Sequence, residues 1–173
     1  AHVENGRADQ AALIYDSPVT DTIKSYTYSE LRDEVAKFAG VLADQGVKKG
    51  DRVIIYMPMI PQAVISMLAV ARLGAVHSVV FGGFAANELA VRIDDARPKA
   101  ILSASCGIEP GRIVEYKPLL DEAVDLASHK PARCVVFQRD VHRADMRPAQ
   151  DLDWSEGMAA AQPHDCVPVA ATD

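Results

Sequence analysis

The sequence has little of what marks several common protein classes. Its 173 residues include three cysteines, Cys106, Cys134 and Cys166, with no Cys-x-x-Cys pair. Neither a disulfide framework nor a zinc ribbon is therefore supported, and we expect reduced thiols and no metal site. The net charge of −6 argues against a nucleic-acid partner, because a general nucleic-acid binder needs a basic face to neutralise phosphates.

Long apolar runs, signal segments and common nucleotide-binding motifs are missing as well. The longest apolar stretch, residues 60–73, is interrupted by Pro61 and Arg72 and falls short of the roughly 20 residues that cross a bilayer. Residues 1–5 show no basic-then-apolar signal pattern. No Gly-x-Gly-x-x-Gly or Walker A sequence occurs. We expect no membrane partner and neither of those two kinds of nucleotide site.

What the sequence does contain is an alternation of apolar strands with helices. Hydrophobic residues make up 49% of the chain, which indicates a packed globular core. Two short β-prone runs at residues 11–15 and 22–27 predict a hairpin. Thr27 and Glu30 then form a capping-box pattern that starts a helix, and Gly46 is expected to end it.

From residue 51 to residue 137, strand and helix alternate with short connections. Strands are predicted at residues 52–57, 75–80, 99–103 and 133–137, and helices at residues 61–73, 85–96 and 116–127. Nearly continuous apolar strands are typical of a parallel sheet that is covered on both faces. We therefore predict an α/β fold of layered β-α-β units with a parallel sheet, and His77 in or near the core.

The last part of the chain has a different character. Residues 138–151 are charged and show no apolar period. A short helix is predicted to open at Asp151 and to run to Ala161, with Trp154 as a packing anchor. Residues 161–173 contain no closing element, and we expect a flexible tail there.

Two glycine-containing loops follow successive predicted strands. In the first, Phe81-Gly82-Gly83-Phe84, two adjacent glycines allow the backbone to approach a ligand closely or to take positive φ. In an open α/β sheet, ligands bind beyond the carboxyl ends of strands, where this loop is expected. A tight strand-to-helix turn explains the same residues, and spacing alone favours that alternative.

The second loop is predicted over residues 105–115. Pro110 fixes one φ, Gly111 permits a tight turn, and Arg112 supplies a fork of donors that suits phosphate. A surface turn with a solvated arginine is the simpler alternative. Cys106 has no identifiable base beside it and is expected to be a buried thiol rather than a nucleophile. Together the two loops are expected to form one pocket wall.

The order of these segments resembles that of AMP-forming short-chain acyl-CoA synthetases, a group within the adenylate-forming superfamily. Three runs carry the resemblance: residues 48–53 (KKGDRV), 56–61 (YMPMIP) and 71–84 (ARLGAVHSVVFGGF). Two further runs, residues 103–112 (SASCGIEPGR) and 115–120 (EYKPLL), are more similar to the propionyl-CoA synthetase branch. The resemblance covers essentially the whole chain.

The resemblance implies a two-step reaction for the full-length protein. ATP, accompanied by Mg²⁺, and a short-chain carboxylate such as propionate or acetate would give an acyl-adenylate and pyrophosphate; the CoA thiol would then displace AMP. Residues 1–173 would be the N-terminal portion of the large domain, with the phosphate loop, acyl pocket, magnesium ligands and catalytic lysine further along the polypeptide. No catalytic residue is expected in this chain, which alone should be inactive. A cytoplasmic location is implied, or the mitochondrial matrix if the source is eukaryotic.

The resemblance also assigns part of the CoA site to this chain. The residues that match CoA-site positions of the family are Phe81, Gly82, Gly83, Glu109, Pro110, Gly111, Arg112, Val114 and Glu115. Arg112 matches an arginine that meets a CoA phosphate. Glu109 departs from acetyl-CoA synthetases, which can carry arginine there, and a carboxylate would repel phosphate. Two alternatives stay open: a non-catalytic nucleotide- or CoA-binding module, and a structural α/β interaction domain.

Overall fold

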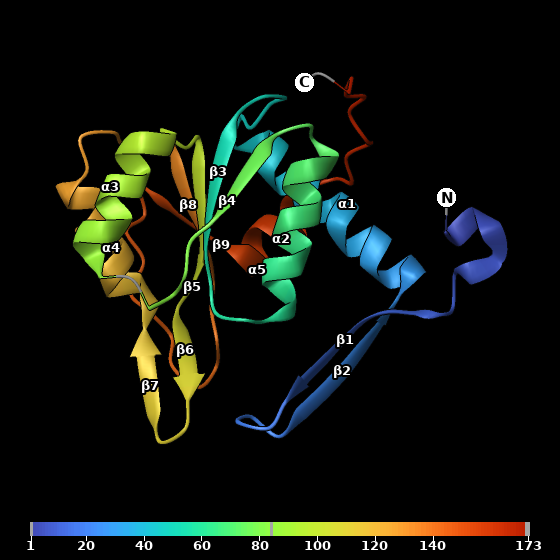
Figure 1. Cartoon of the computed structure of the whole chain (residues 1–173), viewed down its shortest axis with the longest axis horizontal. Helices are drawn as coiled ribbons and strands as arrows, with labels where there is room; N and C mark the ends of the chain where they lie inside the picture. The colour runs from blue at the N-terminus through green and yellow to red at the C-terminus, as the bar shows by residue number, and fades with distance from the viewer. Residues whose placement is uncertain (1, 84, 172–173) are drawn as a thin grey trace.

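A five-stranded parallel sheet forms the centre of the molecule (Figure 1). The computed structural model describes residues 2–83 and 85–171, so Phe84 of the predicted first loop lies outside the described residues. The strands, in the sheet order β4-β3-β5-β8-β9, are β4 (Val76–Val79), β3 (Arg52–Tyr56), β5 (Ala100–Ala104), β8 (Arg133–Phe137) and β9 (Asp151–Asp153). Each neighbouring pair is parallel, which confirms the predicted α/β fold.

Helices cover both faces of this sheet. One face carries α1 (Tyr28–Asp44), α2 (Pro61–Arg72) and α5 (Trp154–Ala160), and the other carries α3 (Ala86–Ala96) and α4 (Tyr116–Leu126) (Figure 1). Strand β3 shows why both faces are apolar. Val53 and Ile55 pack with the first helix group and Ile54 with the second, because successive side chains of a strand point to opposite faces.

The predicted N-terminal hairpin is present, and it projects away from the sheet (Figure 1). After a short helical segment, η1 (Val3–Arg7), strands β1 (Ala11–Ser17) and β2 (Thr22–Thr27) pair antiparallel. The capping box that starts α1 is confirmed, since Glu30 N–H donates to Thr27 Oγ1 at 3.2 Å and Thr27 N–H donates to Glu30 Oε2 at 2.8 Å. The hydrogen bonds that Thr27 donates to the Glu30 carboxylate from its N–H and its hydroxyl lower the pKa of Glu30.

The predicted position of His77 in the core is wrong. Within the part of the chain that the structure describes, His77 lies on β4, which pairs with β3 alone and forms one edge of the sheet. Val76, His77 and Val79 are all exposed, and Ser78 between them is half-buried. The apolar composition of β4 therefore belongs to a sheet edge rather than to a strand enclosed on both sides.

Residues 151–153 form a strand instead of the first turn of a helix. Asp151, Leu152 and Asp153 pair parallel with β8, and α5 begins one residue later at Trp154. Asp153 caps that helix by accepting hydrogen bonds from the N–H groups of Ser155 and Glu156. The mistaken helix start follows from aspartate, which is uncommon in strands and common at helix starts.

Trp154 is the packing anchor that the sequence predicted. Its side chain is buried and stacks on Phe38 of α1, with ring centroids 3.6 Å apart. It also meets the edge of Phe137 from β8, with centroids 6.0 Å apart. The tryptophan thus joins α5 to both α1 and the central sheet.

The predicted flexible tail is instead an extended segment that crosses α1 and α2. The N–H of His164 donates to the carbonyl of Ala36 at 2.9 Å, and the N–H of Val167 donates to the carbonyl of Arg72 at 2.8 Å. Arg72 Nε donates in turn to the carbonyl of His164 at 2.6 Å. Gly40 makes this path available, since a Cβ there would lie only 3.0 Å from the carbonyl carbon of Gln162.

Candidate functional site

Tyr116, at the start of α4, lies between two glycines at the carboxyl edge of the sheet. A Cβ on Gly82 would be 2.6 Å from its ring carbon Cζ, and a Cβ on Gly107 would be 2.8 Å from its Cε2. The ring also lies against Tyr56, at the end of β3, with centroids 4.9 Å apart. Tyr116 therefore brings the predicted Phe81–Gly83 loop and the segment that contains Gly107 to the same place.

Tyr56 also contacts the glycine loop. Its hydroxyl donates to the carbonyl of Gly82 at 3.5 Å. Burial raises the pKa of Tyr56 to about 12 and also raises the pKa of Tyr116, with the Glu109 carboxylate adding to the second effect. Both phenols are therefore neutral hydrogen-bonding groups at physiological pH, and neither is prepared to act as a base.

Residues 105–115, predicted as an irregular loop, are mostly a β-hairpin. Strands β6 (Cys106–Glu109) and β7 (Arg112–Glu115) pair antiparallel, with Glu109 opposite Arg112. Pro110 and Gly111 form the turn, and Gly111 has φ +78°, the positive value that glycine takes most easily. The Pro-Gly pair marks only the turn, whereas the apolar residues on either side of it belong to the two strands.

An ion pair closes the tip of this hairpin. Arg112 Nε and Nη2 both donate to Glu109 Oε2, each at 2.7 Å. The two side chains remain 69% and 51% exposed, so water and ligands can reach them. Glu109, whose role the sequence left doubtful, is therefore the direct partner of Arg112.

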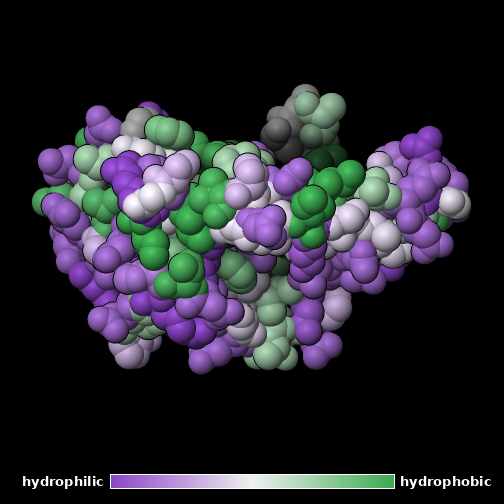
Figure 2. Space-filling view, turned by 90° about the horizontal axis from the view of Figure 1, so that it is seen from below, coloured by the Kyte–Doolittle hydropathy of each residue, from purple (hydrophilic) through white to green (hydrophobic). Residues whose placement is uncertain are grey.

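The hairpin tip lines a cavity of about 850 Å³ together with the turn of the β1–β2 hairpin. Pro18 and Val19 form the part of its wall that comes from the N-terminal hairpin, and Ile108 and Ile113 add apolar surface beside Arg112. Both hairpins project from the same side of the molecule in Figure 1, and Figure 2 views that side, where apolar and polar side chains lie next to one another. No sequence pattern indicates that Pro18 and Val19 line this cavity, because only the fold brings the two hairpins together.

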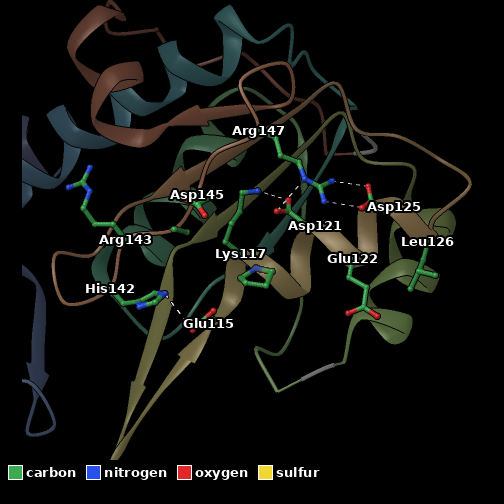
Figure 3. Close-up of a pocket in the computed structure, with 12 residues that line it drawn as sticks. Glu115, Lys117, Asp121, Glu122, Asp125, Leu126, His142, Arg143, Asp145 and Arg147 are labelled. Carbon is green, nitrogen blue, oxygen red and sulfur yellow. Dashed lines mark hydrogen bonds and ion pairs between the residues drawn. The ribbon is translucent and has the colours of Figure 1, made fainter.

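A second cavity, of about 710 Å³, lies between α4 and residues 142–147 (Figure 3). Glu115 faces it and lies 3.7 Å from His142 Nε2. Val114 is half-buried and packs against the core that contains Tyr116. The predicted CoA-site residues therefore do not share one cavity: Phe81–Gly83 lie at Tyr116, Glu109–Arg112 at the hairpin tip, and Glu115 beside the second cavity.

The second cavity lies over a charged cluster that sequence reasoning missed. Lys117 and Asp151 have side chains only 1% exposed and are 2.8 Å apart, and Lys117 also pairs with Asp121. Arg147 binds Asp125 through two hydrogen bonds of 2.8 and 2.9 Å, visible as dashed lines in Figure 3. The Arg147 guanidinium lowers the pKa of Asp125. The cluster joins α4 to β9 and the preceding loop, which is a structural role.

The cysteines provide no reactive centre at either cavity. Cys106 and Cys134 are buried, and Cys166 is exposed. Burial raises the pKa of the Cys134 thiol to about 12, so it stays protonated. Within residues 2–83 and 85–171, no three His, Cys, Asp or Glu side chains are grouped so as to hold a metal ion. In the same part of the chain, no helix combines the length and apolarity needed to cross a membrane.

Comparison with known proteins gives consistent matches. A family model described as AMP-binding enzyme matches residues 1–173. The mitochondrial acyl-CoA synthetase short-chain family member 3 of Rattus norvegicus is 57% identical over 169 residues, which are 97% of this chain and 25% of that protein. The propionate–CoA ligase of Salmonella typhimurium is 48% identical over 144 residues, which are 83% of this chain and 23% of that protein.

A solved structure shows the same fold. The acetoacetyl-CoA synthetase from Streptomyces lividans superposes with a TM-score of 0.81 at 28% sequence identity, over 96% of this chain and 25% of that one. The chain thus spans about a quarter of the length of the relatives that it matches.

Proposed function

The chain belongs to the AMP-binding enzyme family, and on that premise we propose that it supplies part of the CoA site of a short-chain acyl-CoA synthetase. Residues 1–173 would be the N-terminal portion of the large domain of that enzyme. The full-length protein would convert ATP and a short carboxylate to an acyl-adenylate and then transfer the acyl group to CoA. Propionate is the proposed carboxylate, with acetate as the alternative, because a propionate–CoA ligase is among the relatives.

The observation that carries the proposal is the arrangement around Tyr116. This ring contacts Gly82 on one side and Gly107 on the other, so the glycine loop and the base of the β6–β7 hairpin meet at the carboxyl edge of the sheet. Ligands of open α/β sheets bind at that edge. The two segments are also the ones whose sequences match the family's CoA-site positions. Their proximity supports a common role that spacing alone did not favour.

Arg112 is the residue proposed to meet a CoA phosphate. It is exposed at the hairpin tip, beside a cavity with apolar walls, and its guanidinium is a permanent cation. Phe81, Gly82 and Gly83 are proposed to approach the ligand with backbone atoms, and Pro110 and Gly111 to set the turn that carries Arg112. Val114 and Glu115 remain proposed members of the site, although Glu115 faces the neighbouring cavity.

The other components of the reaction are not assigned to residues of this chain. Mg²⁺ would accompany ATP, but the described residues offer no group of three carboxylate, imidazole or thiol ligands for it. No side chain described here is placed as a catalytic acid, base or nucleophile. The compartment also stays a prediction: the cytoplasm, or the mitochondrial matrix if the source is eukaryotic.

Substitution of Arg112 tests the proposal in the full-length protein. Arg112→Ala should raise the KM for CoA roughly 5- to 30-fold, equivalent to about 1–2 kcal/mol for one exposed charge-assisted contact. Pyrophosphate release, which follows adenylate formation alone, should change little. Arg32→Ala is the matched control, because Arg32 is another exposed arginine in a 2.7 Å ion pair, with Asp33 on α1. An unchanged KM for CoA in Arg112→Ala would refute the assignment.

A further inference from the structure

The ion pair at the hairpin tip places a negative charge beside the proposed phosphate contact. We propose that Glu109 is a specificity-determining residue that weakens the attraction of Arg112 for a phosphorylated ligand while leaving the phosphate-binding edge of the guanidinium open. This inference rests on the proposed function, because it takes the phosphate of CoA as the ligand. Arg112 would attract the phosphate, and Glu109 would repel it.

The geometry shows which part of Arg112 remains available. A guanidinium has five N–H donors, one on Nε and two on each terminal nitrogen. Glu109 Oε2 accepts from Nε and from Nη2, which lie along the side edge of the group. The two donors of Nη1 and the second donor of Nη2 are not used by Glu109. One N–H of Nη1 and the second N–H of Nη2 form the terminal edge of the fork, which can bind a phosphate bidentately without displacing Glu109.

The charge of Glu109 should weaken the binding of a phosphate at Arg112. The carboxylate cancels the charge of Arg112, so the tip as a whole carries no net charge. A phosphomonoester carries about −1.5 to −2 at pH 7. If it bound the terminal edge, it would share one guanidinium with the Glu109 carboxylate, and the two anions would lie within the Debye length of about 8 Å. Repulsion in this exposed setting should weaken binding about 3- to 10-fold.

The repulsion acts only on ligands that bear the phosphate. A ligand without that group gains nothing from Arg112 and loses nothing to Glu109. Removal of the Glu109 charge should therefore increase the preference for CoA over 3′-dephospho-CoA. If Glu109 served only to orient Arg112, removal of its charge would leave CoA binding unchanged or weaker.

Glutamine separates these two roles. Glu109→Gln retains the length of the side chain and an oxygen that can accept from Arg112, but it removes the charge. In the full-length protein, we expect Glu109→Gln to lower the KM for CoA about 3- to 10-fold and to leave the KM for 3′-dephospho-CoA unchanged. The gain should shrink as salt is raised from 0.05 to 0.5 M, because the charges are exposed.

A double-mutant cycle completes the test. In an Arg112→Ala background, Glu109→Gln should change the KM for CoA by less than about 2-fold, because no phosphate is then held next to residue 109. Asp33→Asn, which removes the acid of the Arg32 pair, is the control and should leave both KM values unchanged. If Arg112→Ala raises the KM for CoA but Glu109→Gln does not lower it, the role of Glu109 is refuted and the CoA site stands. If Arg112→Ala itself has no effect, the proposed function fails.

Discussion

The ring of Tyr116 occupies the space that a Cβ on Gly82 would need. The separation between that Cβ and ring carbon Cζ would be 2.6 Å, which no pair of carbons tolerates without movement. Glycine at position 82 is therefore required by packing against the first residue of α4. The same ring limits Gly107, where a Cβ would lie 2.8 Å from Cε2. Two glycines far apart in the chain are thus constrained by one side chain.

Alanine at these two glycines should be destabilising and should disturb the proposed CoA site. We expect Gly82→Ala and Gly107→Ala each to lower the free energy of unfolding by about 1–3 kcal/mol, the usual cost of overpacking. Denaturant unfolding measures this, and the KM for CoA should rise in the same variants. In a Tyr116→Ala background the cost of Gly82→Ala should largely disappear. Equal costs in both backgrounds would show that Tyr116 is not the cause.

The buried pair of Lys117 and Asp151 predicts a large effect for a substitution outside the proposed site. Lys117→Met should lower the free energy of unfolding by about 3–5 kcal/mol, because it removes the cation that pairs with the buried Asp151 carboxyl group. Asp151 is especially vulnerable, since within the described part of the chain its Oδ1 is buried with no hydrogen-bond partner. Lys48→Met, at an exposed lysine, is the control and should cost less than about 0.5 kcal/mol. A similar small loss in Lys117→Met would contradict the prediction.

The ion pair of Asp125 with Arg147 should contribute to acid sensitivity. Arg147 lowers the pKa of Asp125 in the folded chain below its ordinary value of 3.8. The pair therefore stabilises the fold above about pH 4, and this contribution is lost as the pH falls through the folded pKa. Asp125→Asn should lose less stability than the unmodified chain between pH 5 and pH 2.5, as measured by urea unfolding. Arg147→Gln should flatten the same part of the profile, and identical acid profiles in all three proteins would refute the prediction.

Thiol reactivity offers a direct check of the burial of the cysteines. Cys166 is exposed, whereas Cys106 and Cys134 are buried, and burial raises the pKa of Cys134 to about 12. An aromatic disulfide reagent should therefore modify one of the three thiols of this chain in native buffer and all three in guanidinium chloride. Cys166→Ser should abolish the native reaction. Rapid native labelling of Cys134 would show that the β8–β9 side of the sheet opens readily.

The sequence predicted those elements whose local pattern agreed with their tertiary setting. Strand β8, at Arg133–Phe137, was predicted with its observed bounds, because a short apolar run lies between a proline-containing turn and a charged segment. The start of α1 at Thr27 was predicted because a capping box is formed by residues three positions apart. In these places local chemistry was sufficient.

The errors lie where distant residues determine the outcome. Asp151–Asp153 form a strand because β8 offers an open edge for pairing, although aspartate has little preference for strands. Lys117 is buried because it pairs with Asp121, one helical turn away, and with Asp151 of strand β9. Of these partners, only the first could have been found from spacing.

The candidate site was predicted in part for the same reason. From residue type alone, a tight turn at Gly82 and a solvated Arg112 were the simpler explanations, and the family resemblance assigned both residues to the CoA site. The hairpin that carries Arg112 was predicted as a loop, and the ion pair of Arg112 with Glu109 was not predicted. The contact of Gly82 with Tyr116 depends on the order of strands β4, β3 and β5, which a single sequence does not reveal.

The extended segment over α1 and α2 has a consequence for how this part of the sequence can vary. Its hydrogen bonds to the helices use its own backbone atoms at His164 and Val167, and Lys49 Nζ likewise donates to the carbonyl of Pro168 at 3.2 Å. Most side chains of the segment are therefore free to differ between relatives while the path of the chain stays the same. The constraint should instead fall on Gly40 in α1, because the backbone of the segment at Gln162 leaves no room for a Cβ there.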